Sequence, residues 1–194
     1  MIEEMEKIDL GALRQVNEDV IGWIRIPGTK VDYPVLQGED NDFYLNHTWE
    51  GKRNYVGSIF MEHLNQPGMS DYNTLIYGHN MKNGSMFAAL RQYINQSYFE
   101  AHPYVYLKID GGVLRYDIFS SYQAEVDGAA YQLSFRQKET RERFLEEVIG
   151  KSVIETGIVP GLQDRILTLS TCTSAGYSTR WVVHARLEMV PTEI

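Results

Sequence analysis

Alternation of apolar and polar positions dominates the middle and the C-terminal part of the chain. Residues 55–64, 73–79, 104–126 and 166–187 are rich in β-branched and aromatic side chains, with the period of two that is typical of strands. An Asp-Gly-Gly turn at 110–112 predicts that the third of these segments is a hairpin. Many short strands separated by turn signals favour a barrel or a sandwich.

Two segments follow the helical period instead. Apolar residues at roughly helical spacings predict one or two short helices over residues 3 to about 20, before the chain reaches Pro27 and Gly28. Residues 134–152 carry apolar side chains on one face and mixed charges on the others, which predicts an amphipathic helix that ends at Gly150. The apolar face of this helix would consist of Phe144, Leu145, Val148 and Ile149.

Short extended pieces connect the N-terminal helices to the later strands. Residues 22–28 predict a strand, and the stretch beyond Asp32, broken by Gly, Asn and Asp, predicts strand and loop. Because 194 residues fit one domain, we expect a single unit. It would consist of a helical extension over about 1–20 and a β unit over about 21–194, with a helix near 138–150.

The charge balance limits the classes of partner. A formal net charge of −8 and the lack of a Lys/Arg cluster argue against nucleic-acid binding, which depends on cations that neutralise phosphates. The sequence contains nothing that resembles a membrane span. Its first ten residues lack the basic and apolar regions of a secretory signal, so either the protein is cytoplasmic or an export segment lies outside this sequence.

The single cysteine and an arginine lie on either side of one turn. Side chains alternate along a strand, so Cys172 shares the polar face of its run with Thr168 and Ser170. If the two runs pair symmetrically about a loop at 173–179, Cys172 opposes Arg180 on one face. An asymmetric loop would shift this register by one residue and separate the two.

A cysteine nucleophile needs a proton acceptor, because the thiolate performs the attack. His184 would oppose Thr168, about 13 Å along the strand from the thiol at the usual rise per residue, which is too far for proton exchange. His79 is the better-placed histidine, since it ends a predicted strand and begins a polar, glycine-containing loop. The remaining histidines, in mixed or loop surroundings, are His47, His63 and His102.

Together these segments resemble a known family. The motif TLSTC at 168–172, the arginine in STRWVV at 178–183 and the motif LIYGHN at 75–80 are similar to the catalytic segments of sortases, which are cysteine transpeptidases of Gram-positive cell surfaces. Residues 22–45 resemble the first strands of that family, so the resemblance covers nearly the whole chain. The N-terminal helices and the helix at about 138–150 make class B the most similar subclass.

The resemblance implies a fold and a set of site residues. The fold is mainly β, a closed eight-stranded sortase-type barrel with N-terminal helices and an amphipathic helix inserted before the cysteine strand. Cys172 would be the nucleophile, His79 the general acid and base, and Arg180 the group that stabilises the oxyanion or orients the substrate. Positions that line the site in class B members correspond to Asn41, Tyr77, Ser170 and Thr171.

The resemblance also implies a reaction and its partners. The enzyme would cleave after Thr in a Pro-x-Thr sorting signal at the C-terminus of a surface protein and hold the acyl part as a thioester on Cys172. An amine of peptidoglycan or of its lipid-linked precursor would then accept it, with no metal or cofactor. We expect an extracellular protein held at the membrane by an N-terminal anchor that this sequence lacks. One departure is the uncharged segment at 173–179, where many class B members carry acidic residues, and it bears on substrate preference.

Three other functions stay open at this point. The first is a sortase that polymerises pilins, and the second is a hydrolytic cysteine protease. The order His, Cys, Arg along the chain argues against the papain-like plan, in which Cys precedes His. The third is a β-barrel without catalytic activity that binds extended peptides and keeps its thiol by accident.

Overall fold

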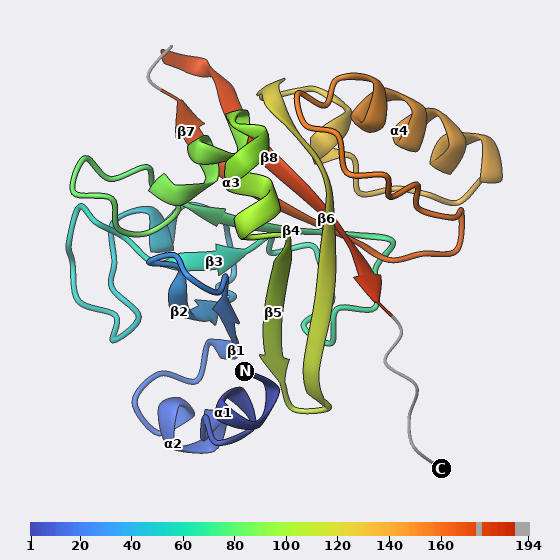
Figure 1. Ribbon diagram of the computed structural model, residues 1–194. Helices are drawn as coiled ribbons and strands as arrows, with labels where there is room; N and C mark the ends of the chain where they lie inside the picture. The colour runs from blue at the N-terminus through green and yellow to red at the C-terminus, as the bar shows by residue number, and fades with distance from the viewer. Residues whose placement is uncertain (174–175, 189–194) are drawn as a thin grey trace.

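The computed structural model describes residues 1–173 and 176–188, with side chains for all of these except residues 172, 173, 176 and 177. Its helices and strands follow one another along the chain as shown in Figure 1. In chain order they are α1 (Ile2–Glu6), α2 (Leu10–Arg14), β1 (Val20–Arg25), β2 (Asp32–Leu36), η1 (Phe43–Leu45), β3 (Ile59–Met61), β4 (Asn73–Gly78), η2 (Ala88–Ile94), α3 (Gln96–Ala101), β5 (Tyr104–Ile109), β6 (Gly112–Glu125), η3 (Ala129–Tyr131), α4 (Lys138–Gly150), β7 (Ile166–Thr173) and β8 (Gly176–Glu188).

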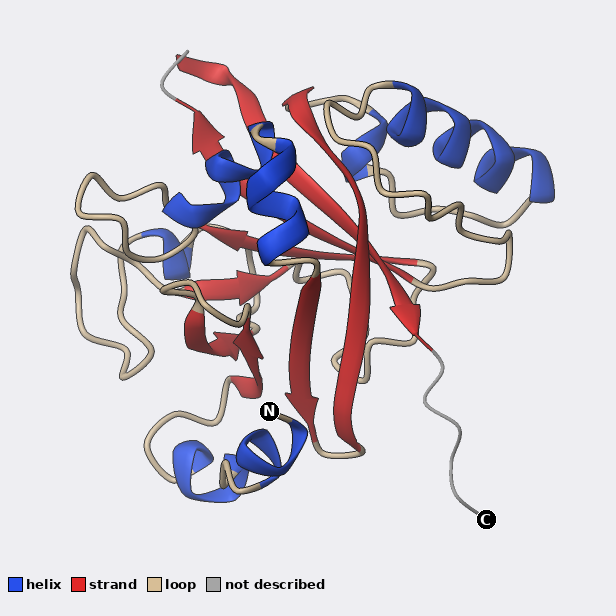
Figure 2. Cartoon of the chain, in the orientation of Figure 1, coloured by secondary structure: helices blue, strands red, loops and turns tan. Residues whose placement is uncertain are grey.

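Over the described residues, eight strands close into a barrel in the order β1-β2-β3-β4-β7-β8-β6-β5. The β2–β3 and β4–β7 pairs are parallel, and the other neighbours run antiparallel (Figure 2). Closure removes the exposed edges that an open sheet would present to other chains. The predicted closed, eight-stranded barrel is confirmed. The hairpin of β5 and β6 lies at the Asp-Gly-Gly turn, as predicted.

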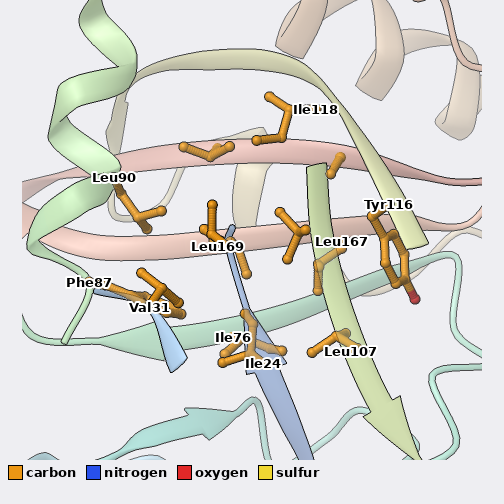
Figure 3. Close-up of a cluster of buried hydrophobic side chains, with 14 of the residues drawn as sticks. Ile24, Val31, Ile76, Phe87, Leu90, Leu107, Tyr116, Ile118, Leu167 and Leu169 are labelled. Atoms are coloured by element: carbon orange, nitrogen blue, oxygen red, sulfur yellow. The ribbon is translucent and has the colours of Figure 1, made fainter. Parts of the chain in front are cut away.

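The barrel interior is filled by the apolar positions of its strands. Leu167 and Leu169 of β7 face Ile76 of β4 and Ile24 of β1 in one buried cluster (Figure 3). The apolar face predicted for β8 joins the same cluster through Trp181, Val183, Ala185 and Leu187. The polar positions of β7 and β8 therefore face outward, which is the side on which chemistry can occur.

Helix α4 covers part of that outer face. Its Phe144, Leu145 and Val148 are buried, as the sequence predicts, against residues of β6, β7 and β8 that include Phe119 and Val182. Figure 1 shows α4 on the outside of the barrel. The helix thus covers one part of the outer face of the barrel. It does not cover the C-terminal end of β7 or the N-terminal end of β8.

The N-terminal segment forms two short helices, but they end earlier than expected. Helix α2 stops at Arg14, and β1 already begins at Val20. The Asn17 side chain accepts a hydrogen bond from the Asp19 backbone N–H at 3.0 Å, a local turn that competes with continued helix. Val16, an apolar residue just beyond the end of α2, is exposed. Among the described residues, none of the helices has the length and apolar character needed to cross a membrane.

His184 is fully buried on the outer side of β8 beneath α4. Its Nδ1 lies 2.9 Å from the Thr168 hydroxyl, which itself donates to Asn73 Oδ1 at 2.6 Å. Its ring lies among those of Phe119, Tyr122 and Phe144. The predicted register is confirmed, because Thr168 opposes His184. This histidine belongs to the packing between α4 and the barrel.

Burial of His184 predicts a loss of stability at mildly acidic pH. Desolvation lowers the pKa of His184 to about 3, whereas an imidazole in the unfolded chain titrates near 6.5. Between these values only the unfolded state takes up the proton, so the free energy of unfolding falls as pH falls, by roughly 1 kcal/mol for each pH unit. We expect urea unfolding at pH 7 and pH 5 to show this loss. A His184→Gln variant should show less of it, and an equal loss would contradict the prediction.

Candidate active site

Strand β7 places Cys172 between two other functional positions. On one side it pairs in parallel with β4, with Tyr77 opposite Ser170 and Gly78 opposite Thr171. Cys172 is the next residue of β7, and His79 directly follows the last residue of β4. On the other side, Cys172 opposes Arg180 of β8. Because neighbouring strands lie about 4.8 Å apart, His79 and Arg180 flank the cysteine backbone from opposite sides.

The register of β7 and β8 confirms the prediction, although β8 begins earlier than expected. We expected a loop at 173–179, whereas β8 already begins at Gly176. Thr173 opposes Gly176, and the register shifts between Cys172 and Thr173. Because the shift lies after Cys172, the earlier start of β8 does not change the pairs from Ile166 to Cys172, which keep the symmetric register. The Cys172 side chain lies outside the described part of the structure.

His79 is held by the loops around it. Its Nε2 lies 2.7 Å from the carbonyl oxygen of Leu45, the last residue of η1. A carbonyl oxygen only accepts hydrogen bonds, so Nε2 carries a proton and donates it. The backbone oxygen of His79 accepts from Phe87 N–H at 2.9 Å. These contacts hold the ring at the end of β4 and engage Nε2 with the Leu45 carbonyl.

One pocket of about 270 Å³ joins the predicted site residues. Arg180 reaches it from β8, where its guanidinium also donates to the Thr179 carbonyl at 2.9 Å. The sequence predicted seven site residues, and six of their side chains line this pocket. They are Asn41, Tyr77, His79, Ser170, Thr171 and Arg180. The seventh is Cys172, for which only the backbone can be placed beside them.

The residues just before the cysteine are buried at the pocket wall. Ser170 Oγ lies 2.7 Å from the hydroxyl of Tyr131, so the two share a hydrogen bond. Thr171 Oγ1 is buried and has no hydrogen-bond partner within residues 1–173 and 176–188. A buried hydroxyl without a partner is costly. Thr171 therefore adds a local energetic cost to the pocket wall, and its buried oxygen is not exposed to the pocket.

Sequence reasoning did not find several residues of the pocket. Tyr131 belongs to η3. Leu45, at the end of η1, and Val126, just after β6, contribute half-exposed apolar side chains. Phe60 of β3 packs against Tyr77, with ring centroids 5.4 Å apart. Strand parity gives no signal for residues that reach the site from loops. An aromatic residue just before the inserted helix, such as Tyr131, was the one available indication.

Comparison with known proteins identifies the family. The family model for the sortase domain matches residues 24–188. Sortase B of Listeria monocytogenes is 38% identical over 183 residues, which are 92% of this chain and 74% of that protein. Sortase B of Staphylococcus aureus is 36% identical over 178 residues, or 91% of this chain and 73% of that protein.

Solved structures agree with the sequence comparison. A Staphylococcus aureus sortase B-substrate complex superposes with a TM-score of 0.90 at 33% identity, covering 97% of this chain and 90% of that one. Clostridium perfringens sortase B gives a TM-score of 0.87 at 38% identity, covering 93% of this chain and 100% of that one. The closed barrel, the N-terminal helices and the order of the segments with His79, Cys172 and Arg180 along the chain support the same family. This chain belongs to the sortase family, and it is a cysteine transpeptidase of the sortase B type.

Proposed function

We propose that Cys172, His79 and Arg180 carry out the transpeptidation. The observation that carries this proposal is the β4-β7-β8 register, which sets the histidine and the arginine on either side of the cysteine backbone at one pocket. The Cys172 thiol gives its proton to Nδ1 of His79, and the thiolate attacks the carbonyl carbon of the scissile peptide bond. Arg180 donates hydrogen bonds to the oxygen that becomes negatively charged.

Collapse of the first tetrahedral intermediate breaks the C–N bond and leaves a thioester on Cys172. The departing amine takes the proton from Nδ1 of His79. In the second half an incoming amine attacks the thioester carbon and gives a proton to Nδ1. The new C–N bond forms as the C–S bond breaks, and the thiolate returns. One nitrogen thus serves as acid and then as base, as an imidazole can near neutral pH.

The pocket fits a short extended peptide. We propose a C-terminal sorting signal with a Pro-x-Thr core, cleaved after the Thr, and transfer to an amine of peptidoglycan or its lipid-linked precursor. Apolar Leu45 and Val126 at the pocket can contact the side chains of such a peptide, while Asn41 and Tyr77 can bind its polar groups. The setting would be the outer face of the membrane of a Gram-positive bacterium.

Product analysis tests the proposal directly. Purified protein is incubated with a library of Pro-x-Thr peptides, with and without an added amine such as triglycine, and the products are identified by mass spectrometry. We expect cleavage after the Thr, a thioester adduct on Cys172 and, when the amine is present, an amide in place of the free acid. Protein alkylated at its cysteine is the control and should be inactive. Free acid as the only product with every amine would instead favour a hydrolytic protease.

A further inference from the structure

A buried carboxylate lies behind the pocket and takes no part in the proposed chemistry. Glu62 follows β3 directly and is only 6% exposed. Glutamate is rarely this buried unless its charge is paired and hydrogen-bonded. Glu62 does not line the pocket itself. Its role therefore has to act through the side chains that it contacts.

Both oxygens of Glu62 are engaged. Oε2 accepts hydrogen bonds from Asn41 Nδ2 at 2.7 Å and from the Tyr77 hydroxyl at 2.9 Å. Oε1 accepts from the backbone N–H of Leu64 at 3.3 Å and lies 2.8 Å from Nδ1 of His63. The two pocket residues thus share a single oxygen atom. Their nitrogen and hydroxyl oxygen are held no more than 5.6 Å apart, the two bond lengths laid end to end.

These contacts determine which hydrogen-bonding groups the pocket offers. Asn41 Oδ1 accepts from the His63 backbone N–H at 3.0 Å, and one Nδ2 hydrogen goes to Glu62, so one N–H is left for a ligand. If the Asn41 amide were rotated by 180°, its oxygen would face the Glu62 carboxylate. Two acceptors cannot form a hydrogen bond, so Glu62 fixes the orientation of the amide. Burial, and then the charge of Glu62, raise the pKa of Tyr77, so its phenol stays neutral, donates to Glu62 and offers its oxygen as an acceptor.

We propose that Glu62 is a positioning residue that fixes Asn41 as a donor and Tyr77 as an acceptor for the main chain of the peptide substrate. An extended peptide presents a carbonyl acceptor and an N–H donor at each residue. Asn41 Nδ2 and the Tyr77 hydroxyl, held close together by Glu62 Oε2, can bind two such groups of one peptide. Glu62 would thereby govern peptide binding and leave the acyl-transfer step unaffected. This inference rests on the proposed peptide substrate.

Peptide binding by an inactive enzyme provides the test. Three proteins that all carry Cys172→Ala are compared: one with Glu62 unchanged, one with Glu62→Leu and one with Glu62→Gln. For each, the dissociation constant of a fluorescein-labelled Pro-x-Thr peptide is measured. We expect the Leu variant to bind about tenfold more weakly, the scale of losing hydrogen bonds to a charged group. Gln should recover part of the affinity, because its one carbonyl oxygen can accept both bonds. In the active enzyme, KM should rise for Leu while kcat changes by less than about twofold.

Two controls separate this role from general stability. Asp117, 7% exposed and paired with Arg115 and Arg186, is an equally buried carboxylate on β6. Asp117→Leu should lower the melting temperature and leave the peptide affinity unchanged. Adding Glu62→Leu to an Asn41→Ala, Tyr77→Phe double variant should weaken binding no further, since the groups through which Glu62 acts are absent.

Different experimental results would contradict the positioning role of Glu62 and the proposed transpeptidation. Unchanged affinity in folded Glu62→Leu and Glu62→Gln proteins would overturn the positioning role, and so would an undiminished effect of Glu62→Leu in the double variant. Failure of the wild-type enzyme to form an amide would instead count against the transpeptidation mechanism, whereas binding by the Cys172→Ala protein would still report on Glu62.

Discussion

A His79→Gln variant should lose roughly three orders of magnitude in kcat/KM for a sorting peptide while keeping the melting temperature of the wild type. General acid and base catalysis contributes about 10²- to 10⁴-fold, and here the same nitrogen serves both half-reactions. The glutamine amide can still donate to the Leu45 carbonyl, as Nε2 of the histidine does. It has no group equivalent to a titrating Nδ1. The measurement is the steady-state rate of peptide cleavage, together with thermal unfolding.

The neighbouring loop offers a matched control for this prediction. His47 also points a ring nitrogen at a backbone carbonyl, with Nδ1 2.8 Å from the oxygen of Phe43, but it does not line the pocket. His47→Gln should therefore leave kcat/KM within about twofold of the wild type. If His79→Gln cleaved the peptide within tenfold of the wild-type rate, Nδ1 would not be the proton carrier.

Strand parity explains why the places of the proposed catalytic residues in the fold could be predicted from the sequence. Side chains alternate strictly along a strand, so the apolar set of β8 from Trp181 to Leu187 also determines where Arg180 points. The residue numbers then pair Cys172 with Arg180 on a simple symmetry argument, and the structure has that pair. His79 was found because a strand ends one residue before it. Local pattern is sufficient wherever a site is built from adjacent strands.

The other features of the site depend on contacts between residues far apart in the chain, which local sequence patterns do not reveal. Glu62 looks like an ordinary charged residue after a short strand, and its burial arises because the loop that carries Asn41 folds over it. Tyr131 reaches Ser170 across 39 residues of sequence, through a segment that the strand pattern leaves unassigned. The helix boundary at Arg14 was missed for a related reason. There a side-chain turn at Asn17 outweighs the apolar spacing.

The second large effect is expected at Arg180. Arg180→Ala should lower kcat/KM by about 10²- to 10³-fold, the usual loss when one donor to an oxyanion is removed. Arg180→Lys keeps the charge but lacks the planar fork of donors, so we expect an intermediate loss of at least about tenfold. If Arg180 stabilises the oxyanion, the loss falls mainly on kcat. If it orients the substrate, the loss falls mainly on KM. Steady-state kinetics of the three proteins would separate the two roles.

Thiol alkylation isolates what Arg180 does for the transition state. The Cys172 thiolate attacks the saturated carbon of iodoacetamide and displaces iodide, so no oxyanion forms and the alkylation rate depends on the thiolate alone. At about pH 9.5, where an ordinary thiol is largely ionised, Arg180→Ala and the wild type should be alkylated at similar rates although acyl transfer stays impaired. The control is Arg186→Ala, on the same face of β8 but paired with Asp117 and Glu188, which should retain peptide cleavage. An Arg180→Ala enzyme equally slow in both reactions would mean that the guanidinium acts on the sulfur and not on the oxyanion.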